Sequence, residues 1–123
     1  MPRERIAMTA AEAAAFLAGK RLAVVGSLGA DGAPDGEPAR LALAGAEIGF
    51  VVPRGGVTYR NVAADPRVVV SVEEFPSYDA IRGVTVLGAA VLAAEEGDEA
   101  RFRVVAPRLE SFDFAKMKYQ AGR

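Results

Sequence analysis

The alternation of hydrophobic and polar residues predicts a mainly β protein of six strands with short helices between them. Runs of apolar and β-branched residues, bounded by Gly, Pro or Asp, have the length and composition of strands. Five such runs are residues 21–29, 34–43, 47–52, 67–75 and 83–93. A sixth strand is expected at residues 108–117, where the alternation is weaker. Gly88, inside the fifth run, predicts a bulge or a close approach by another group.

Turns and helix caps connect these strands. Turns at residues 30–33 and 44–46 join the first three strands as antiparallel hairpins. Thr9 and Glu12 have the spacing of a capping box, which predicts a first helix over residues 9–19. Another helix is expected over residues 97–106, with Asp98 as its N-cap and Pro107 after its end.

The segment PRGGVTYRNV, residues 53–62, predicts a third helix directly after a strand. The hydroxyl of Thr58 is suited to cap a helix of about two turns that begins at Tyr59. Pro66 disfavours helical geometry at Asp65, so the helix is expected to stop there. A strand-to-helix junction of this kind brings unpaired backbone N–H groups to the surface.

This junction is the strongest candidate for a binding site. Gly55 and Gly56 allow a ligand to approach the backbone, and the N–H groups of a helix start suit a phosphate. Arg54 and Arg60 can add charge-assisted hydrogen bonds. The alternative is that the two glycines only form a turn and the arginines are solvated. The sequence leaves both interpretations open.

The overall composition narrows the chemistry. The 123 residues include 15 basic and 16 acidic side chains, so no basic surface for nucleic acid or an anionic membrane is expected. Neither histidine nor cysteine is present, which excludes thiol nucleophiles, disulfides and mechanisms that need a histidine base. No apolar run has the length of a membrane span, and we expect a cytoplasmic protein.

Two other clusters are weaker candidates. The glycine-rich stretch GSLGADGAPDG lacks the spacing of a nucleotide-binding loop and is better explained as a hairpin turn. The carboxylates Glu95, Glu96, Asp98 and Glu99 can ligate a hard cation, but a solvated helix start is the preferred interpretation, and no metal site is expected.

The order of the segments and two motifs point to a known family. Asn61-Val62 followed by Asp65-Pro66-Arg67 looks like an N-L-x-x-D/N-P-R signature. Arg82-Gly83-Val84, with Gly88, is the counterpart in this chain of an R-V-x-V-x-G strand motif. With these motifs, the chain resembles the pyridoxamine 5′-phosphate oxidase-like FMN-binding split barrels, which include deazaflavin-dependent reductases, over roughly residues 9–115.

The resemblance implies a six-stranded antiparallel split barrel as one domain over residues 1–123. Its parts are the helix at 9–19, the barrel at 21–115 and a C-terminal tail at 116–123. The family is usually homodimeric and binds FMN or a deazaflavin in a groove between subunits. The implied function is an oxidoreductase that transfers a hydride between this cofactor and an unknown small molecule.

The resemblance also implies which residues meet the cofactor, although no catalytic residue is implied. Val51 and Val52 would line the ring, the loop from Arg54 to Thr58 would meet the phosphate, and Gly83 and Val84 would approach the ring from below. Arg40 points either to the cofactor or to solvent. The expected cofactor-binding residues are Arg40, Val51, Val52, Pro53, Arg54, Gly55, Gly56, Val57, Thr58, Arg60, Asn61, Gly83 and Val84. Lys116, Lys118 and Tyr119 lie where the family's C-terminal segment reaches the other subunit's groove.

The chain departs from the family pattern at Val57-Thr58, where many members have a basic pair that ends in a phosphate-binding lysine. The missing lysine favours an alternative, a non-catalytic split-barrel dimer that binds or senses a small ligand, or that has lost the cofactor. A β-barrel interaction subunit without a ligand is a third interpretation. A haem-binding protein is less favoured because only methionine or tyrosine can supply an axial ligand.

Overall fold

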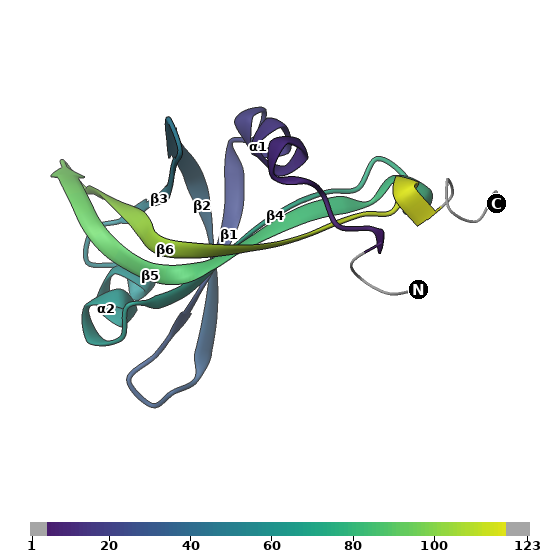
Figure 1. Cartoon of the computed structure of the whole chain (residues 1–123). Helices are drawn as coiled ribbons and strands as arrows, with labels where there is room; N and C mark the ends of the chain where they lie inside the picture. Colours follow the sequence, from purple (N-terminus) through teal and green to yellow (C-terminus); the bar gives the residue numbers. More distant parts are fainter. Residues whose placement is uncertain (1–4, 118–123) are drawn as a thin grey trace.

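The computed structural model describes residues 5–117, which form a closed barrel of six antiparallel strands (Figure 1). The strand order around the barrel is β1-β2-β3-β6-β5-β4. The elements are α1 (Ala10–Ala18), β1 (Leu22–Leu28), β2 (Pro34–Ala44), β3 (Glu47–Pro53), α2 (Val57–Ala64), β4 (Arg67–Glu74), the 3-10 helix η2 (Tyr78–Ala80), β5 (Arg82–Glu96) and β6 (Glu99–Asp113). The predicted six-stranded antiparallel split barrel is therefore confirmed.

Alternate residues of the strands fill the barrel interior. Val25, Val70 and Val86 are fully buried there, each on a different strand. Phe50 and Phe102 stack across the β3–β6 pair with ring centroids 5.4 Å apart. Burying a side chain of this size contributes about 1.5–3 kcal/mol, so the period-two pattern largely determines which face of each strand turns inward. Within residues 5–117, no helix is long and apolar enough to cross a membrane.

Strands β5 and β6 form a long hairpin that bends where its register shifts. One shift lies between Leu87 and Ala89, at Gly88. A Cβ atom at Gly88 would lie 2.7 Å from Val104 Cγ1, and Ala106 on the facing strand has a positive φ of 49°. The predicted bulge or close approach at Gly88 is confirmed. The open end of this hairpin, opposite its turn, extends well beyond the barrel on the right of Figure 1.

The predicted helix over residues 97–106 is wrong, because this segment forms the turn and the first half of β6. Ala100, Phe102 and Val104 are buried and alternate with the exposed Arg101 and Arg103. This period of two suits a strand with one face on the core, and tertiary packing prevails over the helix propensity of Glu, Ala and Arg. The four carboxylates thought to start that helix therefore line the β5–β6 turn and its flanks.

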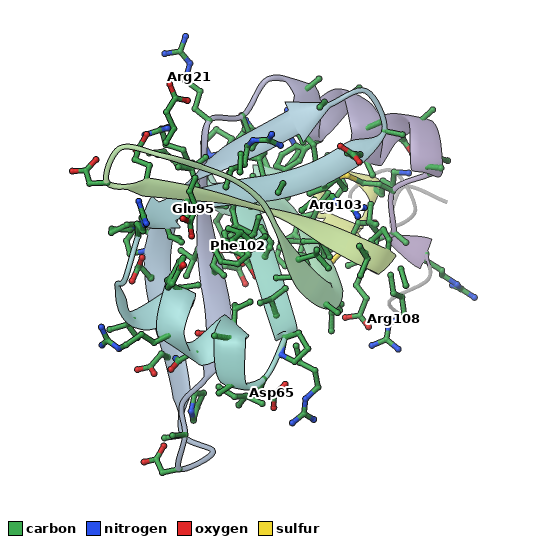
Figure 2. The ribbon with its side chains drawn as sticks, turned by 90° about the vertical axis from the view of Figure 1, so that its left-hand side faces the viewer. Arg21, Asp65, Glu95, Phe102, Arg103 and Arg108 are labelled. Atoms are coloured by element: carbon green, nitrogen blue, oxygen red, sulfur yellow. The ribbon has the colours of Figure 1, made fainter. Side chains whose placement is uncertain are left out.

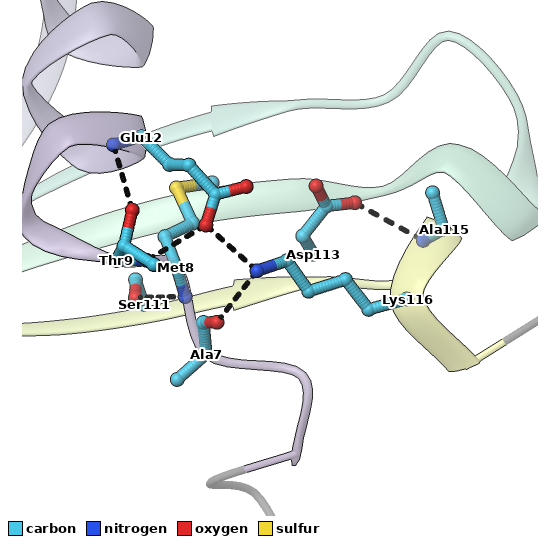
Figure 3. Close-up of polar contacts among 8 residues, drawn as sticks. All are labelled: Ala7, Met8, Thr9, Glu12, Ser111, Asp113, Ala115 and Lys116. Atoms are coloured by element: carbon cyan, nitrogen blue, oxygen red, sulfur yellow. Dashed lines mark hydrogen bonds and ion pairs between the residues drawn. The ribbon is translucent and has the colours of Figure 1, made fainter. Parts of the chain in front are cut away.

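The two ends of the described chain are joined beside α1 (Figure 3). The predicted capping box is present, with the Glu12 N–H donating to Thr9 Oγ1 and the Thr9 N–H donating to Glu12 Oε1. Lys116 Nζ donates to Glu12 Oε1 at 2.7 Å and to the Ala7 carbonyl at 3.1 Å. The Lys116 ammonium, followed by the Thr9 N–H, lowers the pKa of Glu12 to about 2. These contacts fix the segment before α1 to the residues after β6.

Candidate functional site

Helix α2 begins two residues earlier than predicted. Its N-cap is Gly56 and its first residue is Val57, so the prediction of Thr58 as N-cap is wrong. Gly55 has a φ of +75°, and the Gly56 N–H donates to the Pro53 carbonyl at 3.1 Å. This tight glycine turn starts the helix before Thr58 is reached.

Thr58 lies in the interior and cannot meet a ligand at the surface. Its residue surface is only 1% exposed, and its Oγ1 has no hydrogen-bond partner within residues 5–117. The chain thus has a small buried side chain where the resemblance expects a phosphate-binding lysine. A phosphate at the loop must be held by other groups.

Arg54 is bound to the β5–β6 hairpin. Its Nε lies 3.2 Å from Glu95 Oε2, and its backbone N–H donates to the Asp98 carbonyl at 2.8 Å. The Tyr59 hydroxyl donates to the other oxygen of Glu95 at 2.5 Å. That hydrogen bond is the main reason why the pKa of Tyr59 is raised. Glu95 projects from the hairpin on the side of the barrel that carries α2 (Figure 2).

Arg40 points outward from the barrel and is exposed. It donates two hydrogen bonds to the Glu99 carboxylate, at 2.5 and 3.0 Å, and lies directly opposite Val51 in the β2–β3 register. This hydrogen bonding raises the pKa of Arg40 and lowers that of Glu99. The pair forms part of the wall of a cavity of about 330 Å³ on the outer face of β2 and β3. Among its lining residues are Arg40, Val51, Val52, Pro53, Asp98 and Glu99.

Arg60 and Asn61 have different roles although they are neighbours on α2. Arg60 is exposed, and its Nη1 donates to the Gly55 carbonyl at 2.6 Å. Asn61 is buried, and its Nδ2 donates to Ser27 Oγ at 3.1 Å and to Asp35 Oδ2 at 2.9 Å. Asn61 therefore holds α2 against β1 and β2, whereas Arg60 keeps donors free at the loop.

Three of the expected residues lie apart from this loop surface. The side chains of Val52 and Val84 point into the core and are 2% and 1% exposed. Gly83 is opposite Glu73 near the far end of β4, whereas α2 leads into the start of β4 at Arg67. Six residues of strand separate those two ends by about 20 Å. One chain does not bring Gly83 and the loop together.

Sequence reasoning missed the roles of Glu95 and Glu99. It assigned them to a helix start, whereas the strand register places Glu99 directly opposite Pro53. The alternation of charged and apolar residues from Glu99 to Val104 was the signal that indicated a strand. Lys118 and Tyr119, which were expected to reach a partner's groove, lie outside the described residues.

The remaining groups fit one phosphate of a flavin-type cofactor at this loop. The first backbone N–H of α2 with a carbonyl partner four residues back is that of Arg60, which donates to Gly56. The N–H of Val57, the first helical residue, precedes it on an exposed residue and has the place of an unpaired donor of a helix start. Arg60 adds a guanidinium, and a Cβ atom at Gly55 would meet no atom within 4 Å, so the approach is open. Arg40 and Arg54 already have carboxylate partners.

Comparisons with known proteins agree with this architecture. The structure is similar to the conserved hypothetical protein Rv2991 from Mycobacterium tuberculosis, with a TM-score of 0.85, 24% identity and coverage of 96% of this chain and 92% of the other. It is also similar to an FAD-binding protein from Mesorhizobium loti, with a TM-score of 0.72, 19% identity and coverage of 87% and 96%. At these identities the likeness shows a shared fold.

A more distant structural neighbour is the heme storage protein HutZ from Vibrio cholerae, with a TM-score of 0.66, 13% identity and coverage of 82% of this chain and 94% of the other. Among curated proteins, no sequence matches. The family model described as pyridoxamine 5′-phosphate oxidase matches residues 9–122, which is nearly the whole chain. The protein therefore belongs to the pyridoxamine 5′-phosphate oxidase family of split barrels.

Proposed function

We propose that the protein binds a flavin or deazaflavin cofactor at the β3–α2 loop and acts as an oxidoreductase on a small molecule. The observation that carries the proposal is the loop itself. It combines free helix N–H groups, the exposed Arg60 and an open approach at Gly55, next to the cavity on the outer face of β2 and β3. Membership of the family and the flavin-binding neighbours support the choice of cofactor.

The chain's own residues supply binding and orientation. Arg60 and the N–H groups at the start of α2 hold the phosphate, and Val51 and Pro53 provide an apolar surface for the ring. When bound, the cofactor supplies the hydride chemistry. Tyr59 stays protonated at neutral pH, because its pKa is raised and its hydroxyl is engaged by Glu95.

Absorption spectra and ligand titration test this proposal. We expect FMN, FAD or a deazaflavin to bind with micromolar or better affinity, with a change in fluorescence and a rise in melting temperature. A ligand at 100 times its dissociation constant stabilises the folded state by about 2.7 kcal/mol. If none of the three changes either signal, the proposal is wrong.

A second candidate is a non-catalytic protein that stores or senses such a ligand. It is favoured by the ion pairs that engage Arg40 and Arg54 and by the absence of histidine and cysteine. The rate of cofactor oxidation separates the two functions. A storage protein would bind the reduced cofactor without accelerating hydride transfer to any acceptor, whereas an oxidoreductase would accelerate it for at least one.

We also propose that the protein forms a homodimer through the outer face of β1 and β4. Leu22, Val24 and Val69 lie on this face and are 69%, 50% and 37% exposed. A cavity of about 560 Å³ continues the face across Gly26, Val69 and Leu87. A contiguous apolar surface of this kind is typical of an interface. A partner copy would also be the source of the Gly83 region, which one chain keeps away from the loop.

A further inference from the structure

The surroundings of the β3–α2 loop are balanced in charge. Four arginines and four carboxylates lie on the loop, in the first turn of α2, in the β5–β6 turn and at the positions of β2, β5 and β6 that pair with or flank residues 51–53. They are Arg40, Arg54, Arg60 and Arg101, with Glu95, Glu96, Asp98 and Glu99. The positive groups left over are the partial charges of the helix N–H groups, which amount to about half an elementary charge. The site therefore has little capacity to neutralise a second negative charge.

Glu95 is the best fixed of these carboxylates. Its side chain is 26% exposed, against 45% for Glu99, and it has two partners, Arg54 and Tyr59. The Tyr59 ring packs edge-on against Phe102 with centroids 6.0 Å apart. A rigid aromatic ring thus holds the Glu95 carboxylate beside the loop.

The position of Glu95 has two effects on an incoming phosphate. Arg54 can turn to the phosphate only by giving up its ion pair with Glu95, so it is not free to add a positive charge to the site. In addition, any charge on the ligand is repelled by Glu95 itself at short range. A phosphate monoester has a charge of about −1.5 to −2 at pH 7, whereas a diester has a single negative charge, so the monoester meets the larger penalty.

We infer that Glu95 determines specificity at this site by favouring a singly charged phosphodiester over a doubly charged phosphate monoester. The inference rests on the proposed function, since it concerns the phosphate of the same cofactor. It narrows the ligand class to flavins or deazaflavins whose phosphate is esterified on both sides.

Two ligands that differ by one charge test this inference directly. FMN and its phosphate monomethyl ester have the same ring and ribityl chain, and only FMN has the second ionisable oxygen. The variants are Glu95→Gln and, as a matched control, Glu96→Gln, which makes the same charge change on the next residue. Glu96 is exposed, and its side chain has no ion pair or hydrogen bond within the described range 5–117.

Dissociation constants are measured by quenching of flavin fluorescence. We expect the wild-type protein to bind the methyl ester about tenfold more tightly than FMN, which corresponds to about 1.4 kcal/mol. In Glu95→Gln, the ratio of the dissociation constants of FMN and its methyl ester should fall to near one, because FMN binds more tightly. Glu96→Gln should keep the wild-type ratio. A variant that only disturbs the fold would bind both ligands more weakly by the same factor. The ratio of their dissociation constants would then stay unchanged.

Three results would overturn the inference, and they differ from one another. Equal binding of the two ligands by the wild-type protein shows that the site does not select by charge. The same change of ratio in both variants shows a general effect of hairpin charge rather than a role of Glu95. If neither ligand binds to any of the proteins, the inference fails, and the proposed function fails as well only if FAD and a deazaflavin also leave the protein unchanged.

Discussion

Thr58 shows how the burial of one side chain changes what a loop can bind. Because the turn at Gly55 and Gly56 starts α2 early, Thr58 becomes the second helical residue and faces the core. The sequence predicts that its hydroxyl caps the helix, whereas in the structure the hydroxyl is buried and has no hydrogen-bond partner among residues 5–117. In the proposed function, Arg60 and the backbone therefore take the phosphate-binding role.

Replacing Thr58 with valine should stabilise the protein. The change keeps the branched shape and removes a buried hydroxyl without a partner, so we expect a gain of about 1 kcal/mol in the free energy of unfolding. Urea denaturation measures it. Thr58→Ser is the matched control, since it keeps the hydroxyl and loses the methyl group, and should destabilise by about 1 kcal/mol. A loss of stability in Thr58→Val would mean that the hydroxyl has a stabilising partner.

At the scale of elements, period-two alternation predicted five strands with bounds close to those found. The first half of the sixth strand was wrongly predicted as a helix because Glu, Ala and Arg have high helix propensity. The alternation of Phe102 and Val104 with the arginines indicated the strand correctly. Arg54 and Arg60 could be located from the sequence because the loop is local. Their partners could not, since the contact of Arg54 with Glu95 depends on how β3 and β6 pair.

At Gly49 the pairing of β3 with β6 leaves no room for a side chain. A Cβ atom there would lie 2.1 Å from the Phe102 carbonyl oxygen. Gly49→Ala should therefore push the strands apart and cost about 3 kcal/mol or more of stability. Gly19→Ala is the control, because a Cβ atom there meets nothing within 4 Å, and it should change stability by less than about 0.5 kcal/mol. Equal midpoints of urea unfolding for the two variants would contradict this account.

At the scale of the whole molecule, the barrel has an apolar outer face, on which we propose that a second copy packs, and a set of contacts that joins its two ends. The face lies on β1 and β4, and the fastening joins the segment before α1 to Lys116. The first feature concerns assembly. The second concerns how stability depends on pH.

Val24→Glu should convert the proposed dimer into a monomer. The side chain is half exposed on the outer face of β1, so a charge there costs little in the isolated subunit but is unfavourable in an apolar interface. Light scattering measures the mass. Val91→Glu is the control, because Val91 is 39% exposed and lies opposite Arg103 in the β5–β6 register. A wild-type protein that is already monomeric would refute the dimer.

The ion pair of Glu12 with Lys116 predicts a pH dependence of stability. Since the pKa of Glu12 falls from 4.5 to about 2 in the folded state, its contribution is fully present above about pH 4.5 and is lost as the pH falls towards 2. Lys116→Met should raise the Glu12 midpoint in an NMR titration and lower the melting temperature at pH 6 but not near pH 2. Asp65, whose pKa is also lowered to about 2 by Arg67, should titrate as before. An unchanged Glu12 midpoint would show that Lys116 does not contact it.

The place of β6 between β3 and β5 has a consequence for synthesis on the ribosome. Until residues 99–113 have left the exit tunnel, the nascent chain can form at most an open sheet in the order β3-β2-β1-β4-β5, with both outer edges unpaired. The unpaired N–H and C=O groups of such edges can form hydrogen bonds with strands of other chains. Barrel closure must therefore follow the emergence of β6, and a chain that stalls before that point keeps the edges of β3 and β5 open to pairing with other chains.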